Sequence, residues 1–220
     1  MLAIKDALRD SRERGQAELD GEFNRGEDPW RYSELPCHKD RVRHELAMLD
    51  SVRRAARFRL VLEVGCAEGL FTEQLVERCD SLLAVDISPV ALGRARQRRQ
   101  WDHRVSFAEW DLRADSLPDR YDLIVIIHAL EYVRNPIAVR RARRKLVDGL
   151  LPGGYLLVGT MGGNEVFRDS WWGRYLLRGG RHLNAFLGKH PALTLVATAE
   201  TALGDGEEEV SYDILLRKAR

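Results

Sequence analysis

The sequence predicts an α/β fold with an open, mostly parallel, seven-stranded sheet, helices on both faces, an antiparallel hairpin at the C-terminal side and a helical N-terminal cap. From about residue 56 onward, short apolar runs alternate strictly with segments of helical periodicity, which is typical of parallel strands joined by crossover helices. After about residue 190 this alternation stops. Two apolar runs then follow with only a short, turn-rich segment between them, so these two strands must be antiparallel neighbours.

The first 55 residues differ in character and are expected to form a helical cap. Residues 2–19 have weak helical amphipathicity, and residues 21–36 are rich in glycine, proline and turn formers, which predicts a loop. Apolar residues between His38 and Val52 then recur at helical spacing. The chain therefore divides into a cap, 1–55, and a sheet domain, 56–220.

Strands and helices alternate through the predicted sheet domain, and an insertion interrupts them near the end. The strands are expected at RLVLEVG (59–65), SLLAVDI (81–87), RVSFAEW (104–110), YDLIVIIHAL (121–130), GGYLLVGTM (153–161), ALTLVATAE (192–200) and EVSYDILLRK (209–218). The helices are expected at GLFTEQLVERC (69–79), PVALGRARQRR (89–99) and NPIAVRRARRKLVDGL (135–150). An aromatic, basic insertion at 164–190 is also expected to be helical.

Composition excludes several classes of protein. The 220 residues are 45% hydrophobic and 31% charged, as in a globular domain. No apolar run approaches the roughly 18 residues of a membrane span, and the N-terminus has no apolar block of signal-peptide length. Three scattered cysteines, Cys37, Cys66 and Cys79, favour neither a disulfide framework nor a zinc site. We therefore expect a reduced, cytoplasmic protein that acts without a metal or a membrane.

The loop after the first strand, EVGCAEG (63–69), is the expected ligand-binding element, since ligands of such sheets bind beyond the carboxyl ends of the strands. Gly65 permits a tight turn, Gly69 permits close helix packing, and the small Ala67 lets an adenosine pass near the backbone. A dinucleotide fingerprint needs three glycines, at the first, third and sixth positions, and only the first is present here. Glu68 would also place negative charge where a pyrophosphate would sit.

Acidic residues end the first three predicted strands in order. Asp86 could accept hydrogen bonds from both hydroxyls of a ribose, although alone it could equally be a turn or helix-capping residue. Asp111 could accept from an adenine amino group, with the backbone N–H of Leu112 facing the ring, although a lone aspartate there would more often belong to a turn. Together with Glu63, the series indicates an adenosine-containing cofactor.

The motifs LVLEVGCAEGLFTEQLVERC (60–79), LLAVDISPVALGRARQR (82–98), YDLIVIIHALEYV (121–133) and LPGGYLLVGT (151–160) resemble those of class I, Rossmann-like methyltransferases that use S-adenosylmethionine. With Asp28-Pro29-Trp30 upstream, the chain most resembles the nodulation protein S family, N-methyltransferases acting on amino-sugar oligosaccharides. The resemblance covers about residues 27–160 and implies binding of S-adenosylmethionine with release of S-adenosylhomocysteine. The implied cofactor-binding residues are Glu63, Gly65, Cys66, Ala67, Gly69, Asp86, Ile87, Asp111, Leu112 and His128.

Two residues after the fourth predicted strand are candidates for a general base. Methyl transfer to an amine requires prior loss of a proton, and transfer to a hydroxyl requires a base during attack. His128 has a suitable ordinary pKa of about 6.5, and Glu131 would share its face if the segment were helical. The alternative for His128 is a wall that orients the acceptor or a core histidine bonded to backbone.

Aromatic residues in the cap and in the insertion are candidates for covering the site. Trp30 and Tyr32 lie in a polar loop, where a core residue is less expected, and could form a lid over the cofactor. Trp171 and Trp172 could stack on a flat acceptor such as a sugar ring, or could simply seal the sheet. The acceptor is therefore expected to be a small molecule.

Other functions compete with this interpretation. Arginine clusters in three predicted helices could mark an RNA methyltransferase, but a net charge of +1 favours solvated helix faces and no nucleic-acid partner. A non-catalytic cofactor-binding regulator on the same fold would carry the same acidic residues. A nicotinamide oxidoreductase is disfavoured by the 63–69 loop.

Overall fold

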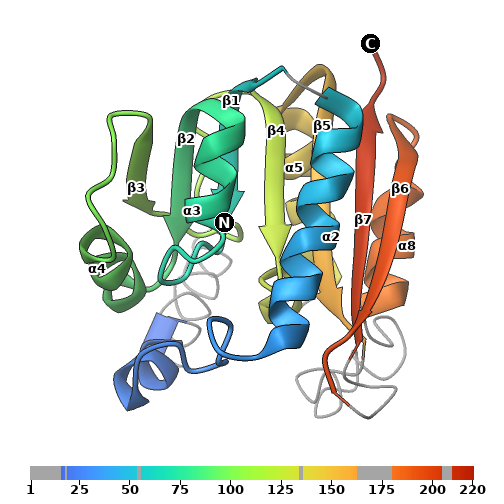
Figure 1. Cartoon of the computed structure of the whole chain (residues 1–220). Coiled ribbons are helices and arrows are strands. Elements are labelled where there is room, and N and C mark those ends of the chain that lie inside the picture. Colours follow the sequence, from blue (N-terminus) through green and yellow to red (C-terminus); the bar gives the residue numbers. More distant parts are fainter. Residues whose placement is uncertain (1–15, 18, 54–55, 134–135, 163–179, 205–209) are drawn as a thin grey trace, which may run out of the picture.

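The computed structural model describes residues 16–17, 19–53, 56–133, 136–162, 180–204 and 210–220. Its centre is one twisted seven-stranded sheet of order β3-β2-β1-β4-β5-β7-β6 (Figure 1). The strands are β1 Phe58–Val64, β2 Cys79–Asp86, β3 Val105–Glu109, β4 Tyr121–Ile127, β5 Leu150–Met161, β6 Leu193–Ala202 and β7 Val210–Lys218. The first five pair in parallel, whereas β7 pairs antiparallel with both β5 and β6. This confirms the predicted fold class.

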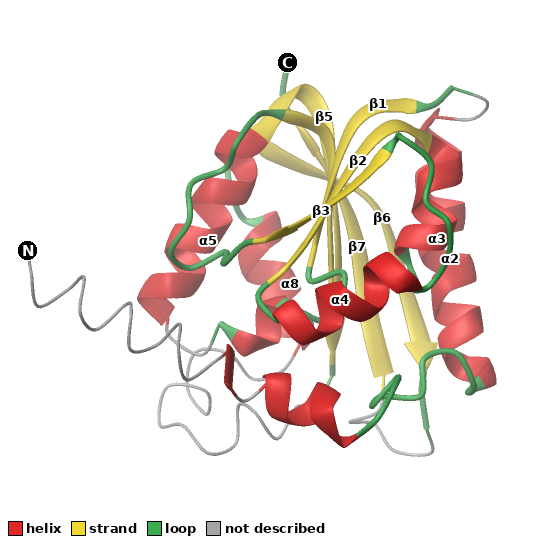
Figure 2. Ribbon diagram, turned by 90° about the vertical axis from the view of Figure 1, so that its left-hand side faces the viewer, coloured by secondary structure: helices red, strands yellow, loops and turns green. Residues whose placement is uncertain are grey.

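Helices cover both faces of the sheet, as Figure 2 shows. One face carries α2 (Pro36–Arg53) and α3 (Thr72–Leu75), which continues into the 3₁₀ turn η1 (Val76–Arg78). The other face carries α5 (Pro136–Gly149) and α8 (Gly180–Gly188). The helix α4 (Pro89–Gln97) follows β2 and packs Leu92 against Ala84 of that strand, and the 3₁₀ turn η2 (Leu130–Tyr132) follows β4.

The central strand β4 shows why its sequence is apolar without alternation. Leu123, Ile124, Val125 and Ile126 are all 0% exposed. Leu123 and Val125 pack on the side of α2 and α3, whereas Ile124 and Ile126 pack on the side of α5 and α8. Because both faces of the strand are buried there, these four consecutive positions all have to be apolar.

The helix expected at 69–79 is shorter than predicted. Gly69 adopts a φ of +83°, in the left-handed region, so the helix cannot begin there. A single α-helical turn starts at Thr72, and Cys79 already belongs to β2, paired with Phe58. The first half of the connection from β1 to β2, residues 65–71, is therefore loop, and part of it lines a pocket.

The loop expected at 21–36 is also partly wrong, because residues 21–25 are helical; the described residues 16, 17 and 19 are helical as expected. Phe23 is only 2% exposed and packs edge-on against Trp30, with ring centroids 5.2 Å apart. This tertiary contact stabilises helix in a segment whose glycine and asparagine content disfavours it. Of the insertion at 164–190, the structure describes 180–190, where α8 confirms the helical expectation; Trp171 and Trp172 lie outside the described residues.

The described helices include none that is both long and apolar enough to cross a membrane.

Candidate functional site

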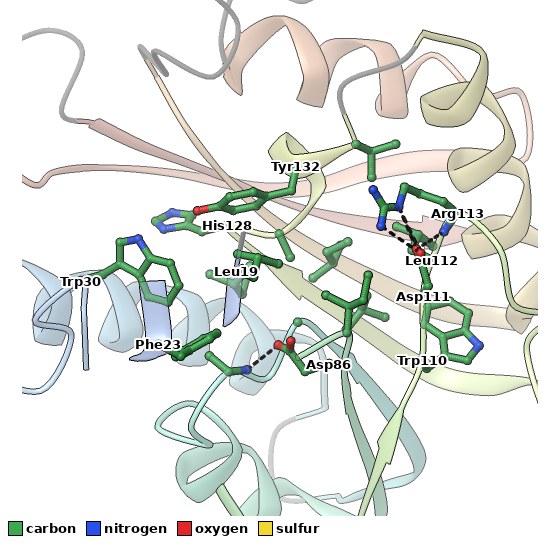
Figure 3. A pocket seen from close by; sticks show the side chains of 18 of the residues that line it. Leu19, Phe23, Trp30, Asp86, Trp110, Asp111, Leu112, Arg113, His128 and Tyr132 are labelled. Carbon is green, nitrogen blue, oxygen red and sulfur yellow. Dashed lines mark hydrogen bonds and ion pairs between the residues drawn. The ribbon is translucent and has the colours of Figure 1, made fainter. Parts of the chain in front are cut away.

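A pocket lies where the carboxyl ends of β1, β2, β3 and β4 meet the N-terminal segment (Figure 3). Each strand contributes the residues at its end or in the loop that follows. From the sheet the lining residues are Val64, Gly65, Ala67, Asp86, Ile87, Trp110, Asp111, Leu112, Arg113, Ile126, Ile127, His128, Ala129, Tyr132 and Val133. From the N-terminal segment they are Leu19, Phe23, Trp30 and Tyr32. The strand ends that the sequence singled out therefore converge on one cavity.

The loop after β1 is held by the end of β2. The N–H groups of Gly65 and Cys66 donate to the Val85 carbonyl at 2.8 and 3.0 Å. Gly65 has a φ of +77°, and a Cβ there would lie 2.4 Å from the Cβ of Ala129. A side chain at this position would be strained and would also collide, which explains the glycine. Gly69 likewise packs against Ala95, as predicted.

Asp86 both shapes this loop and faces the pocket (Figure 3). Its carboxylate accepts the N–H of Ala67 and the N–H of Ser88, each at 2.9 Å. It is 7% exposed, and burial raises its pKa. Each carboxylate oxygen retains a lone pair after these contacts, so the group can still accept hydrogen bonds from ligand hydroxyls.

Asp111 lies across the pocket and is engaged by Arg113, a residue that the sequence analysis did not single out. The Arg113 guanidinium donates through Nη2 at 2.9 Å and through Nε at 3.0 Å, and its backbone N–H donates at 2.8 Å. A basic residue two positions after an acid is too common in turns to signal a site. Both Asp111 oxygens are thus engaged by Arg113, and the guanidinium plane provides a surface on which a flat ring can stack.

Glu63 and Cys66 lie behind the loop and line a second, adjoining pocket, which shares Trp30, Tyr32 and Gly65 with the first. Glu63 accepts the Thr72 hydroxyl at 2.7 Å, and burial raises its pKa to about 8. Burial also raises the pKa of the Cys66 thiol, so the sulfur stays protonated.

Glu68 attaches the N-terminal segment to the loop. One carboxylate oxygen accepts the backbone N–H of Asp28 at 2.8 Å, and the other pairs with Arg94 of α4 at 2.7 Å. The same Arg94 nitrogen donates to the Gly26 carbonyl at 2.7 Å, and the Ser88 hydroxyl bonds Asp20. Glu68, whose charge disfavours a pyrophosphate here, therefore holds the N-terminal segment against the loop.

Trp30 and Tyr32 form part of an aromatic row over the pocket. The Trp30 and Tyr32 rings stack with centroids 5.9 Å apart, and Tyr32 meets the His38 ring edge-on at 4.6 Å. The Tyr32 ring lies 6.4 Å from the His128 ring. The turn that presents them is closed by the Asp28 carboxylate, which accepts the N–H groups of Tyr32 and Ser33.

His128 directly follows β4 with a φ of +49°, and its N–H donates to the Gly159 carbonyl at 2.9 Å. Its Nε2 lies 2.9 Å from the Ser211 hydroxyl, and the ring lines the pocket. Burial is the largest cause that holds the His128 pKa well below its ordinary value, followed by the positive charge of Arg41. The imidazole is therefore neutral near pH 7, with a lone pair on one ring nitrogen, and the same burial makes it a weaker base than a free imidazole. Tyr132, on η2, also lines the pocket and was not predicted.

The side chain of Glu131, the second candidate base, does not line the pocket. The left-handed backbone of His128 and the 3₁₀ turn after it do not place the two side chains on one helix face. Glu131 is 1% exposed, accepts the Met161 N–H at 2.6 Å and lines neither of the two adjoining pockets. Burial raises its pKa to about 7.

Within the described part of the chain, no three His, Cys, Asp or Glu residues are placed to hold a metal ion.

Comparison of the sequence with known proteins identifies one family. The family model of nodulation protein S (NodS) matches residues 14–179. Nodulation protein S of Bradyrhizobium diazoefficiens is 36% identical over 135 residues, which are 61% of this chain and 63% of that protein. A ubiquinone biosynthesis O-methyltransferase of Xanthomonas campestris pv. campestris is 31% identical over 156 residues, 66% of this chain and 63% of that protein. The matched region thus spans less than two thirds of these relatives.

Solved structures agree with the sequence match. The N-methyltransferase NodS from Bradyrhizobium japonicum WM9, crystallised in complex with S-adenosyl-L-homocysteine, is similar with a TM-score of 0.81 at 30% identity, covering 94% of this chain and 99% of that one. The 1,6-didemethyltoxoflavin-N1-methyltransferase of Burkholderia thailandensis reaches a TM-score of 0.69 at 17% identity, which shows a shared fold.

Proposed function

The chain belongs to the nodulation protein S (NodS) family, and on that premise we propose that it transfers a methyl group from S-adenosylmethionine to a nitrogen or oxygen nucleophile of a small molecule. The observation that carries the proposal is the convergence of Gly65, Asp86 and Asp111 on one pocket at the carboxyl ends of parallel strands.

The residues around this pocket fit the cofactor. Asp86 keeps lone pairs for the two ribose hydroxyls, and Asp111 with the Leu112 N–H suits an adenine edge. Gly65 and Ala67, both with positive φ, let a ligand approach the backbone closely. We assign Glu63, Cys66, Gly69 and Ile87 supporting roles around these contacts. When bound, S-adenosylmethionine supplies an electrophilic methyl group on a sulfonium.

The chain's own contribution to transfer is to orient the acceptor, exclude water and take up a proton. Trp30 and Tyr32 cover the pocket, which favours water exclusion and alignment of the reacting atoms. His128 is neutral and borders the pocket, so we propose that it accepts the acceptor's proton or forms the wall that orients it. Glu131 is the second candidate; it would need to exchange its bond to Met161 to reach a ligand.

The proposal extends to an amino sugar or a glycosylated metabolite as acceptor, in line with the family. The apolar and aromatic lining, Phe23, Trp30, Tyr32 and Tyr132, suits a ring whose faces are apolar and whose edges carry hydroxyls. We propose no nucleic-acid partner, because the charges of the chain nearly cancel. A cytoplasmic location and a role of Trp171 and Trp172 stay predictions.

Ligand binding tests the cofactor first. S-adenosylhomocysteine at 100 times its Kd is expected to raise the free energy of unfolding by about 2.7 kcal/mol, and therefore to raise Tm. NAD should leave Tm unchanged. Calorimetric titration with S-adenosylmethionine, S-adenosylhomocysteine and NAD gives the affinities. No shift at millimolar S-adenosylhomocysteine would overturn the assignment.

A transfer assay then tests the acceptor. Radiolabelled S-adenosylmethionine is offered with panels of amines, amino sugars, phenols and an RNA. We expect label in the amine or sugar panels. Label in the RNA alone would favour an RNA methyltransferase, and tight cofactor binding without transfer to any panel would favour a regulator.

A further inference from the structure

A buried polar chain leads from His128 into the sheet. His128 Nε2 lies 2.9 Å from Ser211 Oγ, and Ser211 Oγ donates to Asp213 Oδ1 at 2.9 Å. Ser211 is 0% and Asp213 is 1% exposed. The fold makes room for this carboxyl group, because a Cβ on Gly159, its register partner in β5, would lie 2.6 Å from Asp213 Oδ1. A buried acid in the middle of a sheet requires such specific accommodation.

When Asp213 is ionised, the number of protons in this chain fixes the tautomer of His128. A serine hydroxyl has one proton, and Ser211 gives it to Asp213. The proton between His128 and Ser211 must then come from Nε2, so in a neutral imidazole Nδ1 carries the lone pair. Nδ1 has no hydrogen-bond partner among the described residues, and His128 lines the pocket. The free lone pair is therefore the one available to a ligand.

A second buried carboxyl group, that of Glu45, acts on Asp213 through its charge. Glu45 of α2 is 0% exposed and pairs with the buried Arg41 at 2.6 Å, and neither Glu45 Oε2 nor Asp213 Oδ2 has a hydrogen-bond partner within the described structure. Glu45 thus holds the guanidinium, and the charges of both Glu45 and Arg41 act on Asp213. Burial, followed by the negative charge of Glu45, raises the pKa of Asp213 to about 8. Asp213 consequently titrates in a range where an enzyme works.

We propose that Ser211 and Asp213 are positioning residues that switch His128 between a proton-accepting and a non-accepting tautomer. With Asp213 ionised, Nε2 is protonated and Nδ1 can accept. With Asp213 protonated, its hydrogen goes to Ser211 Oγ, the Ser211 hydrogen goes to Nε2, and the imidazole hydrogen sits on Nδ1. This inference rests on the proposed function, which supplies the acceptor.

The proton transfer balances along the same chain. When an ammonium acceptor gives up a proton, its N–H bond breaks, the electron pair stays on nitrogen, and a new bond forms at Nδ1. The imidazolium passes its Nε2 proton to Ser211 Oγ, and Ser211 passes its own proton to the Asp213 carboxylate. The result is a neutral His128 and a protonated Asp213, which returns the proton to water afterwards.

Other charged and titratable groups face this chain and bear on its pH dependence. Arg41 and His38 of α2 lower the pKa of His128, and Tyr32 of the cap lies beside its ring. Glu45 raises and Arg41 lowers the pKa of Asp213. Glu131 on η2 also faces Asp213, whose charge raises the Glu131 pKa.

Nitrogen-15 NMR of the His128 ring tests the switch without any methyl acceptor. In the whole protein bound to S-adenosylhomocysteine, we expect the Nδ1–H tautomer below about pH 8 and the Nε2–H tautomer above it. Ser211→Ala and Asp213→Asn should each abolish the change with pH. A single His128 tautomer from pH 6.5 to 9.5 in the unsubstituted protein would overturn the inference, even if neither variant folds.

Thr201→Val provides a matched control. Thr201 is the cross-strand neighbour of Ser211, and its hydroxyl lies 2.9 Å from Nδ1 of His44, which lines neither of the two adjoining pockets. The substitution removes the same kind of contact from a different histidine. It should change the His44 signals and leave the pH-dependent change of His128 intact. Loss of the His128 change in this variant too would assign the effect to general disturbance of the strands and contradict the inference.

Kinetics complete the test. Loss of a buried hydrogen bond to a reacting group should lower kcat by roughly tenfold to hundredfold in Ser211→Ala, with KM and the Kd of S-adenosylhomocysteine little changed. In the unsubstituted protein kcat should rise with pH through about 8, and in Asp213→Asn this rise should vanish. Normal cofactor binding and transfer with an unaltered pH profile in Asp213→Asn would overturn the inference alone, whereas absent cofactor binding would overturn the proposed function.

Discussion

The two sides of the pocket are built differently. The side formed by β1, β2 and β3 takes its pocket-lining groups from strand ends and from the loops that follow them, at Gly65, Asp86 and Asp111. The side around His128 depends on residues far apart in the chain. Ser211 is 83 positions away, and Arg41 and Glu45 come from a helix that precedes the whole sheet.

The β1–β3 side of the pocket is therefore expected in any protein of this fold, whereas the His128 side is expected to be specific to the reaction. Consecutive strands of a parallel sheet always bring their carboxyl ends to one edge, so the first side follows from topology alone. The second side needs β7 to pair antiparallel with β5, which places Asp213 opposite Gly159. Changes on the first side should therefore alter cofactor affinity, and changes on the second side should alter turnover.

The largest effect is expected from His128→Asn. Asparagine tolerates the φ of +49° better than alanine does, so the backbone should keep its course while the proton acceptor is lost. If His128 is a base, kcat falls by about 10²–10⁴-fold with the Kd of S-adenosylhomocysteine little changed. Steady-state kinetics and calorimetry measure both.

A rise confined to the KM of the acceptor would instead assign His128 to the wall of the pocket. Full turnover with unchanged KM in His128→Asn would show that His128 is neither the base nor the orienting wall. Glu131 would then be the next residue to test. His44→Asn serves as the control, because its ring bonds Thr201 away from the pocket and its loss should leave kcat unchanged.

Asp86→Asn should act on the other side. The amide loses the negative charge and can accept fewer hydrogen bonds, so the Kd of S-adenosylhomocysteine should rise by roughly tenfold to hundredfold. At saturating cofactor, kcat should change little. Calorimetric titration checks the affinity.

Asp122→Asn is the matched control for this change. Asp122 also accepts two backbone N–H groups, those of Arg59 and Leu60, but lines neither of the two adjoining pockets. It should lower stability and leave the cofactor affinity unchanged. An unaltered Kd in Asp86→Asn would show that Asp86 only shapes the loop.

The smallest effect is a slope of stability with pH. Burial raises the pKa of Glu63 and of Asp213 to about 8, so each binds a proton in the folded protein that it lacks when unfolded near neutrality. The stability from these protonated forms is full below the unfolded pKa and is lost as pH rises through about 8. We therefore expect Tm to fall between pH 6.5 and 9.

Glu63→Gln and Asp213→Asn should each flatten this slope, by up to about 1.4 kcal/mol per pH unit. Urea titrations at several pH values measure it. Equal slopes in all three proteins would show that both acids ionise in the folded state as they do when unfolded.

The contrast between the two sides also explains how much the sequence could predict. The sheet, its C-terminal hairpin and the three acidic strand ends followed from alternation and from short loops, which are local patterns. Arg113 and Tyr132 were missed because an arginine after an aspartate and a tyrosine in a turn are ordinary surface residues until the fold is known. Ser211 and Asp213 lie in a strand whose sequence, Val210–Lys218, predicts only a half-buried hairpin. Their contact with His128 depends on strand order, which the pattern of the hairpin does not fix.

The 2.4 Å approach between a Cβ on Gly65 and the side chain of Ala129 has a consequence for how the sequence can change. Any larger residue at Gly65 would first require Ala129 to become glycine, and any residue larger than alanine at 129 would press on the Gly65 loop. The two positions are thus expected to accept substitutions only in a fixed order. Because Gly65 belongs to the loop after β1 and Ala129 directly follows His128, changes in sequence next to His128 are restrained by the geometry of that loop.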